Sequence, residues 1–386
     1  MKLDEFLEQK PLYYKEIDYD RFPNIWDKYK EHFTLPKIIH VIGTNGKGST
    51  GRFLAHYLHK IDLKVGHYSS PHILTFNERI WLNGKNADDA TLQKHHEKLQ
   101  SLIDEEDLKA MSYFEYTTLL AVSVFEGVEY IVMEAGLGGE YDATAVFPKD
   151  LTIVTPIGMD HESFLGTTLE RIAKTKLNAI HKFALLGKQQ KSVYKIAKEF
   201  SRKKGIEFFR YGFFYSKEEL ARARRTIRII GLPAFFLENL LLGLAAVKFF
   251  GYEIKWRLME DVRLLGRMQK VAPNITLDVG HNPLAAEAIV QSMKKQKVIL
   301  VYNSYEDKDY KQILEILQPI IKKVEILPIY NQRIENQKQL EETIASLGLE
   351  YGEFDAIKEN EHYLVFGSFA VAEEFLKHYV PTKEQQ

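Results

Sequence analysis

Short apolar runs typical of buried strands alternate with helical patterns along almost the whole chain. This alternation limits the possible folds more than any other feature. In the first part of the chain, strands are predicted at residues 37–42, 65–68, 128–134 and 151–155. Helices are predicted at residues 50–60, 169–180 and 192–204. The pattern indicates an α/β fold with a mostly parallel sheet, because a helix can return the chain to the start of the next strand.

The same alternation restarts near residue 266 and predicts a second, smaller α/β domain. Its strands are expected at residues 275–279, 298–302, 324–327 and 362–366. Its helices are expected at residues 283–293, which open with a proline, and at residues 310–321, where apolar side chains recur at helical spacing. The most polar gap between the two patterns lies at residues 255–266. We therefore place the domain boundary near Leu265.

The 386-residue chain has no cysteine and a formal net charge of −1, and both facts exclude classes of protein. Disulfides, thiolate metal sites and a cysteine nucleophile are ruled out. A charge so close to zero gives no sign of binding to nucleic acid or to a membrane surface. The most apolar stretch, residues 117–135, contains three glutamates, so it is expected to form a helix and a strand rather than a membrane span. We expect a cytoplasmic protein.

A glycine-rich loop, Gly43-Thr44-Asn45-Gly46-Lys47-Gly48-Ser49, connects the first predicted strand to a helix. This arrangement binds phosphates, because glycines let backbone N–H groups approach the oxygens and the helix N-terminus adds a positive dipole end. Lys47 would neutralise the β- and γ-phosphates, and Ser49 could contact phosphate or a metal ion. The loop departs from the usual G-x-x-x-x-G-K-[ST] pattern, since Gly48 separates Lys47 from Ser49. It still predicts an ATP site in a P-loop-type N-terminal domain.

Polar residues follow three other predicted strands of the same sheet. Ser70 comes just after residues 65–68, Glu134 ends the next run, and Asp160-His161 follow residues 151–155. The carboxyl ends of parallel strands meet at one edge of a sheet, so these side chains are expected near the phosphate loop. A carboxylate there could hold a phosphate-bound Mg²⁺ ion. The alternatives are a solvated carboxylate at Glu134 and a structural histidine at His161.

The second domain has a comparable segment, Asp278-Val-Gly-His281-Asn-Pro283, between a predicted strand and a predicted helix. Asp278 could accept hydrogen bonds from a ribose. His281 could contact the nucleotide or a second substrate.

Together these motifs resemble the folylpolyglutamate synthase and dihydrofolate synthase family of the Mur ligase superfamily. The resemblance extends from about residue 15 to residue 369, and its motifs occur in the order found in that family. Besides the loop and the segment at 278–283, the matching segments are residues 68–72, 77–80, 113–116, 134–139, 141–144, 160–161, 165–167 and 266–267.

The resemblance implies an activity. Members of the family add L-glutamate to 7,8-dihydropteroate, or lengthen a γ-linked glutamate tail on reduced folates. ATP first phosphorylates the acceptor carboxylate, and the glutamate amine then displaces phosphate. The two anions repel each other, so cations must screen them before transfer. The resemblance implies two Mg²⁺ ions for this purpose. The resemblance further implies a monomer in which residues 1–265 bind ATP and the pterin substrate, and residues 266–386 form a Rossmann-like domain that binds glutamate.

The resemblance also assigns roles to individual residues. The residues matched to catalysis are Lys47, His161 and Lys176. The residues matched to ATP contacts are Asn45, Gly46, Lys47, Gly48, Ser49, Asn239, Arg267 and Asp278. The residues matched to Mg²⁺ ligands are Ser70, Glu134, His161 and Lys176. The residues matched to substrate contacts are Phe114, Glu115, Tyr141, Asp142, Ala143 and His281.

Lys176 matches a lysine that the family carries as a carbamate, in which the ammonium is replaced by an anionic oxygen ligand. Its surroundings depart from the family, with Thr175 in place of an acid and Leu177-Asn178 in place of Ala-Gly. Without the resemblance, Lys176 would be interpreted as a surface lysine on the helix at residues 169–180. The carbamate is therefore a prediction from the resemblance alone.

Two other functions compete with this interpretation. Mur peptidoglycan ligases usually carry an N-terminal domain for a UDP-sugar, and the 42 residues before Gly43 are too few for one. A P-loop ATPase or GTPase acting as a switch or transporter subunit would explain the phosphate loop. It would not explain the ordered set of motifs that continues to His281. Phosphate release that depends on both dihydropteroate and glutamate would separate the three.

Overall fold

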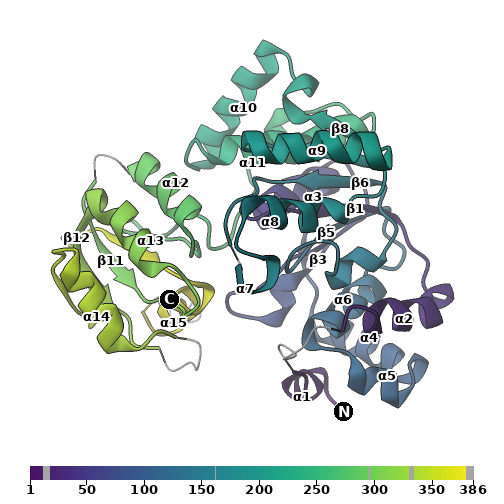
Figure 1. Cartoon of the computed structure of the whole chain (residues 1–386), viewed down its shortest axis with the longest axis horizontal. Coiled ribbons are helices and arrows are strands. Elements are labelled where there is room, and N and C mark those ends of the chain that lie inside the picture. The colour runs from purple at the N-terminus through teal and green to yellow at the C-terminus, as the bar shows by residue number, and fades with distance from the viewer. Residues whose placement is uncertain (12–17, 161, 294–295, 330–333, 380–386) are drawn as a thin grey trace. The chain divides into compact units, whose positions relative to one another are not determined.

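A computed structural model describes residues 1–11, 18–160, 162–293, 296–329 and 334–379 (Figure 1). The chain forms two compact units. The first comprises Met1–Ile230 and Phe236–Val262, and the second comprises Gly231–Phe235 and Arg263–Gln386. Each contains a mostly parallel sheet with helices, which confirms the predicted α/β fold class. Among the described residues, no helix is both long and apolar enough to cross a membrane.

The sheet of the first unit has, within the described residues, eight strands in the order β4-β3-β2-β5-β1-β6-β7-β8. The strands are β1 (Lys37–Ile42), β2 (Val65–Tyr68), β3 (Ile80–Leu82), β4 (Lys85–Asn86), β5 (Tyr130–Glu134), β6 (Leu151–Val154), β7 (Phe183–Leu186) and β8 (Glu207–Arg210). The pairings that involve β3 and β4 are antiparallel, and the others are parallel. Strand β1 lies between β5 and β6, so the loop that follows β1 emerges at the centre of the sheet.

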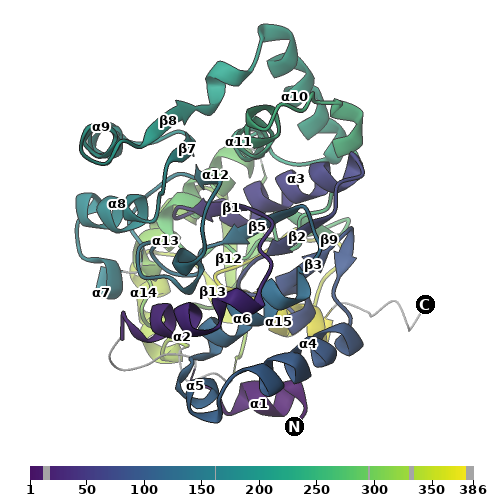
Figure 2. The ribbon, with the colours of Figure 1, turned by 90° about the vertical axis from the view of Figure 1, so that its right-hand side faces the viewer.

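Helices cover both faces of this sheet. The helices of this unit are α1 (Leu3–Glu8), α2 (Arg21–Tyr29), α3 (Lys47–Lys60), α4 (Asp89–Leu102), α5 (Glu105–Ala110), α6 (Tyr113–Val124), α7 (Glu162–Leu165), α8 (Leu169–Asn178), α9 (Lys191–Lys204), α10 (Lys217–Ile230) and α11 (Phe236–Phe249). Helices α3 and α11 lie side by side and pack on the strands (Figure 2). Apolar clusters join side chains of α6 to Ile38 and Met133, and side chains of α8 to Ile42 and Val154. Both faces of the central strands are therefore buried, as expected for a parallel sheet.

The second unit has, over its described residues, six strands in the order β13-β12-β11-β14-β10-β9. The strands are β9 (Gln269–Ala272), β10 (Ile275–Leu277), β11 (Val298–Tyr302), β12 (Ile321–Ile326), β13 (Tyr351–Glu353) and β14 (Tyr363–Phe366). Its helices are α12 (Pro283–Met293), α13 (Tyr310–Leu317), α14 (Gln337–Ser346) and α15 (Phe369–Tyr379). Among the described strands of the second unit, the pairing of β9 with β10 is the only antiparallel one.

The prediction of a helix at residues 310–321 was wrong at its C-terminal end. Helix α13 ends at Leu317, a short 3-10 helix covers Gln318–Ile320, and Ile321 already begins β12. Pro319 explains the early end, because proline cannot donate the backbone hydrogen bond that an α-helix needs there. Ile321 had matched the helical spacing by coincidence, since a buried strand also begins with an apolar residue.

Candidate active site

The phosphate loop is held against the end of β6 by close packing and by hydrogen bonds. Gly43 has a φ of +138°, and a Cβ added to it would lie 2.0 Å from Oγ1 of Thr155. The N–H of Thr44 donates to the carbonyl of Pro156 at 3.0 Å. The Thr44 hydroxyl lies 3.1 Å from the Gly158 carbonyl. The residues after β6 therefore fix the path of the loop, and only glycine fits at position 43.

Lys47 is the first residue of α3, and its side chain folds back over the loop. Its Nζ lies 3.4 Å from the carbonyl oxygens of Gly43 and Thr44. Asn239 of α11 also contacts the loop. Its Nδ2 donates to the Gly46 carbonyl at 3.3 Å and to Oγ1 of Thr50 at 3.1 Å. The structure thus brings Asn239 to the same loop as Asn45, Gly46, Lys47, Gly48 and Ser49.

Two of the predicted metal ligands, Ser70 and Glu134, lie at the ends of the adjacent strands β2 and β5, and β5 pairs with β1. Strand β2 pairs Tyr68 with Met133 of β5, and Val41 of β1 pairs with Glu134. Ser70 and Glu134 therefore leave adjacent strands at the same edge of the sheet as the loop. Glu134 is buried. His161 lies outside the described residues.

Lys176 is buried beside the loop, which excludes the alternative that it is a surface lysine. Only 4% of the residue is exposed. Its Nζ donates to the carbonyl of Gly43 at 3.0 Å and lies 3.4 Å from the carbonyl of Gly138. Burial lowers the pKa of Lys176 to about 7, and the charge of Lys47 adds to this effect. A large fraction of this amine is therefore neutral near neutral pH.

The glycine-rich turn after β5 packs directly on α8 and so positions Lys176. A Cβ on Gly139 would lie 2.8 Å from the carbonyl oxygen of Lys176 and 2.9 Å from its Cα. The N–H of Glu140 donates to the carbonyl of Thr175 at 3.0 Å. A side chain at position 139 would push α8, and Lys176 with it, away from the loop.

Asp142 is a buried carboxylate with several donors. Its Oδ2 accepts from the N–H of Leu137 at 2.7 Å, and its Oδ1 accepts from the N–H of Thr144 at 3.0 Å and from the Thr144 hydroxyl at 2.5 Å. Burial raises the pKa of Asp142, whereas these hydrogen bonds and the charge of Lys47 lower it. Nζ of Lys176 lies near both Gly138, in the turn that Asp142 holds, and Gly43 of the loop, over which Lys47 folds, so the three side chains surround one region.

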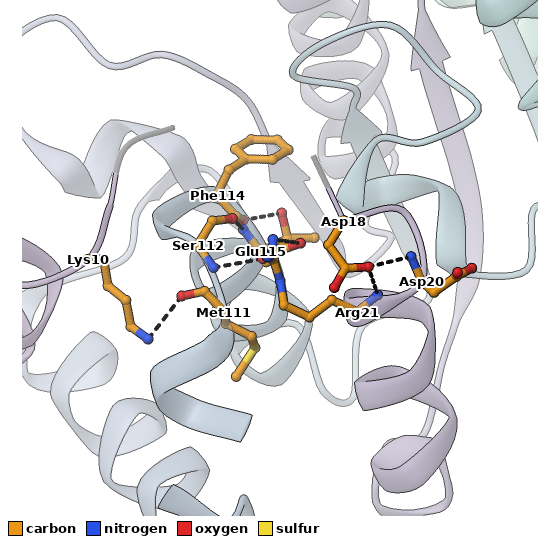
Figure 3. A network of polar contacts seen from close by, with 9 residues as sticks. Lys10, Asp18, Asp20, Arg21, Met111, Ser112, Phe114 and Glu115 are labelled. Carbon is orange, nitrogen blue, oxygen red and sulfur yellow. Dashed lines mark hydrogen bonds and ion pairs between the residues drawn. The ribbon is translucent and has the colours of Figure 1, made fainter. Parts of the chain in front are cut away.

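Glu115 links α6 to α2 (Figure 3). Both of its carboxylate oxygens lie 2.9 Å from Nη2 of Arg21, and Oε2 also accepts from the N–H of Ser112 at 2.7 Å. Ser112 in turn accepts from the N–H of Glu115, which completes a capping box at the start of α6. The Glu115 carboxylate is thus engaged in holding two helices together, and its contact with substrate stays a prediction.

Three more residues matched to substrate contacts, Phe114, Tyr141 and Ala143, also belong to the first unit. Phe114 packs on the turn after β5, since a Cβ on Gly136 would lie 2.6 Å from its Cζ. Tyr141 is 57% exposed, and its ring centroid lies 4.2 Å from that of Tyr19. Ala143 is buried at the start of a 3-10 helix, η3 (Ala143–Val146).

A shallow pocket of about 320 Å³ lies beside the Arg21–Glu115 ion pair. Its lining comes from α2 with the residues just before it and from α5, and includes Arg21, Lys28 and Asp107. None of the residues predicted for the site lines it.

The second unit gathers three of the predicted residues at the end of β10. Asp278 is buried, and its carboxylate accepts from the N–H groups of Gly280 at 2.8 Å and Met268 at 2.9 Å. Burial raises the pKa of Asp278, and the Arg267 charge lowers it. The Arg267 guanidinium lies 5.5 Å from the ring centroid of Phe369, and the His281 ring lies 6.3 Å from the same centroid. Arg267, Asp278 and His281 thus form one local group.

Comparisons with known proteins identify the family. The family model described as the Mur ligase middle domain matches residues 41–247. A crystal structure of Helicobacter pylori folylpolyglutamate synthetase is 41% identical, covers 97% of both chains and superimposes with a TM-score of 0.79. A dihydrofolate synthase/folylpolyglutamate synthase of Buchnera aphidicola is 31% identical over 86% of each sequence. The chain belongs to the folylpolyglutamate synthase and dihydrofolate synthase family.

A further member of the folylpolyglutamate synthase family shows the same two-unit architecture. The structure of Escherichia coli FolC in complex with DHPP and ADP is 27% identical to this chain. It covers 98% of this chain and 97% of its own, with a TM-score of 0.84. The likeness therefore includes both units, and the fold predicted from the alternating pattern is that of the family.

Some residues at the candidate site were not singled out from the sequence. Thr155 lies against Gly43, and its position at the end of β6 was a usable signal, the same one that pointed to Ser70. Tyr19 and Arg21 contact predicted residues, but neither was assigned a role at the site from the sequence.

Proposed function

We propose that this chain is an ATP-dependent ligase that joins L-glutamate to the carboxylate of a pterin-bearing acceptor, either 7,8-dihydropteroate or a reduced folate. The observation that carries the proposal is the arrangement of Lys47, Lys176 and Asp142 around a phosphate loop of the form used by the family. The names of the relatives support it. The Helicobacter pylori protein is a folylpolyglutamate synthetase, and the Escherichia coli protein was solved with DHPP and ADP.

The reaction needs one group transfer and one displacement. An oxygen of the acceptor carboxylate attacks the γ-phosphorus of ATP, and ADP leaves. The glutamate amine then attacks the carbonyl carbon, loses a proton, and phosphate departs with the attacking oxygen. Lys47 and the N-terminal end of α3 would neutralise the phosphates during the first step, which otherwise brings two anions together.

The residues at the sheet edge fit a magnesium ion bound mainly by phosphates. Among the described residues, no three histidine, aspartate or glutamate side chains form a cluster that could hold a metal ion. A nucleotide-bound Mg²⁺ needs less, because it takes one or two protein oxygens and completes its shell with phosphates and water. The Glu134 carboxylate and the Ser70 hydroxyl supply such oxygens. Bound there, the cation would offset the charge of the phosphates.

We propose a second magnesium ion held by His161 and by a carbamate on Lys176. A neutral lysine amine adds to carbon dioxide, forms an N–C bond and releases a proton. Lys176 is suited to this reaction because burial keeps much of its amine neutral near pH 7. Its position beside the Gly43 carbonyl would bring the new carboxylate close to the phosphate loop.

We expect a carbamate signal in carbon-13 NMR spectra after equilibration with carbon-13 bicarbonate. The signal should be strong at about pH 8 and weaken as the pH falls through about 7, because protonation of the amine prevents the reaction. Lys176→Arg should remove the signal. Lys174→Arg is the matched control, because Lys174 is exposed on the same helix. A native signal that persists in Lys176→Arg would place the carbamate elsewhere.

We propose that the second unit contributes Arg267 and Asp278 to the nucleotide and His281 to the nucleotide or glutamate. Each Asp278 oxygen accepts one backbone hydrogen bond and retains capacity for a ribose hydroxyl. The Arg267 guanidinium offers charge for a phosphate or a carboxylate. We further propose that the enzyme acts as a monomer in the cytoplasm, where ATP is supplied.

The test is phosphate release from ATP by the purified chain, measured with each substrate omitted in turn. We expect release only when a pterin-bearing acceptor and L-glutamate are both present. Release that ignores both substrates would instead indicate a P-loop ATPase, and release that depends on a UDP-sugar peptide would indicate a peptidoglycan ligase. A parallel comparison of dihydropteroate with tetrahydrofolate monoglutamate then decides between dihydrofolate synthesis, tail extension and both.

A further inference from the structure

A line of buried polar contacts runs from the centre of the first sheet to Asp142. His40 of β1 is fully buried, and its Nε2 lies 2.7 Å from Oγ1 of Thr144. Thr144 is 1% exposed, and its Oγ1 lies 2.5 Å from Oδ1 of Asp142. These three side chains thus form a series of hydrogen bonds, and its outer end, Asp142, is a residue that the family resemblance matches to substrate contacts.

The direction of these hydrogen bonds follows from the number of hydrogens available. An ionised carboxylate only accepts, so the single hydrogen of the Thr144 hydroxyl must point to Asp142. The Thr144 oxygen can then only accept from His40, which requires a hydrogen on Nε2. The complete burial of the imidazole favours this neutral form, and it lowers the pKa of His40 well below its usual value. Nδ1 carries no hydrogen in this tautomer, and it has no hydrogen-bond partner among the described residues.

The hydrogen bonds that run from His40 through Thr144 have a clear consequence for Asp142. Burial alone would favour a protonated Asp142, which could then donate a hydrogen bond as well as accept one. The donors from Leu137 and Thr144 favour the ionised form, and the Thr144 hydroxyl fixes where Oδ1 lies. A pterin ring presents an amino group and ring N–H groups, which need a carboxylate acceptor of fixed orientation.

We propose that His40 and Thr144 are positioning residues that hold Asp142 as an oriented acceptor for the pterin ring. This inference rests on the proposed function and adds how the ring is recognised. Neither residue touches the substrate itself, and both act through the Asp142 carboxylate.

Three variants separate positioning from a general effect on the core. Thr144→Val keeps the shape of the side chain and removes the hydroxyl, whereas Thr144→Ser keeps the hydroxyl. Thr152→Val is the matched control, because Thr152 of β6 is in register with His40 and is buried, as Thr144 is. Its hydroxyl has no hydrogen-bond partner within the described part of the chain, so the same substitution removes no contact.

We expect Thr144→Val to raise the KM for the pterin-bearing acceptor about tenfold to hundredfold, the usual effect of losing a hydrogen bond to a charged group. The KM for ATP should change less than about twofold, and Thr144→Ser should restore most of the acceptor affinity. An unchanged acceptor KM in Thr144→Val, or an equal rise in Thr152→Val, would overturn the proposal. Absence of turnover in the native chain would instead overturn the proposed function.

The tautomer of His40 gives a readout that is independent of activity. Nitrogen-15 NMR of histidine-labelled protein, with the His40→Gln variant used for assignment, should show a neutral ring with its hydrogen on Nε2. A hydrogen on Nδ1 alone would contradict the proposed direction of the hydrogen bonds from His40 to Thr144 and from Thr144 to Asp142. The spectrum also keeps the proposal testable if Thr144→Val fails to fold.

Discussion

Lys47→Ala is expected to lower kcat by at least about a thousandfold while the protein stays folded. Lys47 supplies the main positive charge at the phosphate loop, and removing a group that stabilises the transferring phosphate costs about 10² to 10⁵ in rate. The fold should tolerate the change, because the Lys47 ammonium contacts two carbonyl oxygens at 3.4 Å, near the limit of a hydrogen bond. Steady-state kinetics and the melting temperature measure the two effects separately.

Lys60→Ala is the control for this experiment. Lys60 lies at the opposite end of the same helix and forms a partly exposed ion pair with Asp261. Such surface pairs contribute about 0 to 1 kcal/mol, so this variant should keep a native kcat. A near-native kcat in Lys47→Ala would mean that the loop does not hold the phosphates of ATP.

Gly43→Ala is expected to lower kcat/KM for ATP by at least about a hundredfold. The new Cβ would lie 2.0 Å from Oγ1 of Thr155 and 2.9 Å from the Thr155 backbone oxygen, so the loop must move away from β6. That movement also displaces the Gly43 carbonyl, which accepts from Lys176. Misplacing catalytic groups by about 1 Å can cost about 10²-fold in rate, which sets the expected size.

Gly127→Ala isolates the cost of backbone conformation. Gly127 also has a positive φ, +79°, but a Cβ there would meet nothing within 4 Å. Its alanine variant should lose about 1 to 2 kcal/mol of stability and keep its kinetic constants. If Gly43→Ala behaved like Gly127→Ala, the contact between the loop and Thr155 would have no role in ATP use.

Local pattern predicted most of the fold because the strands that build both sheets are short apolar runs bounded by polar turns. The strand at 37–42 and the helix at 283–293 occur at their predicted bounds. The end of α13 was missed because Ile321 fits both a helical face and the start of a strand. A spacing rule cannot distinguish these two cases without the effect of Pro319.

The candidate site was predictable where chemistry follows a strand, as at Lys47 and Glu134. Where a position depends on packing between distant segments, local pattern did not predict it, and only the family resemblance pointed to Asn239 and Lys176. Asn239 reaches the loop across 193 residues of sequence. Lys176 is buried because the turn at Gly139 packs on its backbone, and no local pattern encodes that contact.

The most direct test of the account follows an oxygen atom from the acceptor to the product. The acceptor carboxylate is labelled with oxygen-18, and the reaction runs with ATP and L-glutamate. If the carboxylate attacks the γ-phosphorus, one labelled oxygen must appear in the released phosphate, and the amide product retains the other. We expect one labelled oxygen per phosphate. Unlabelled phosphate, released while the amide forms, would contradict the acyl-phosphate route and with it the role proposed for the phosphate loop.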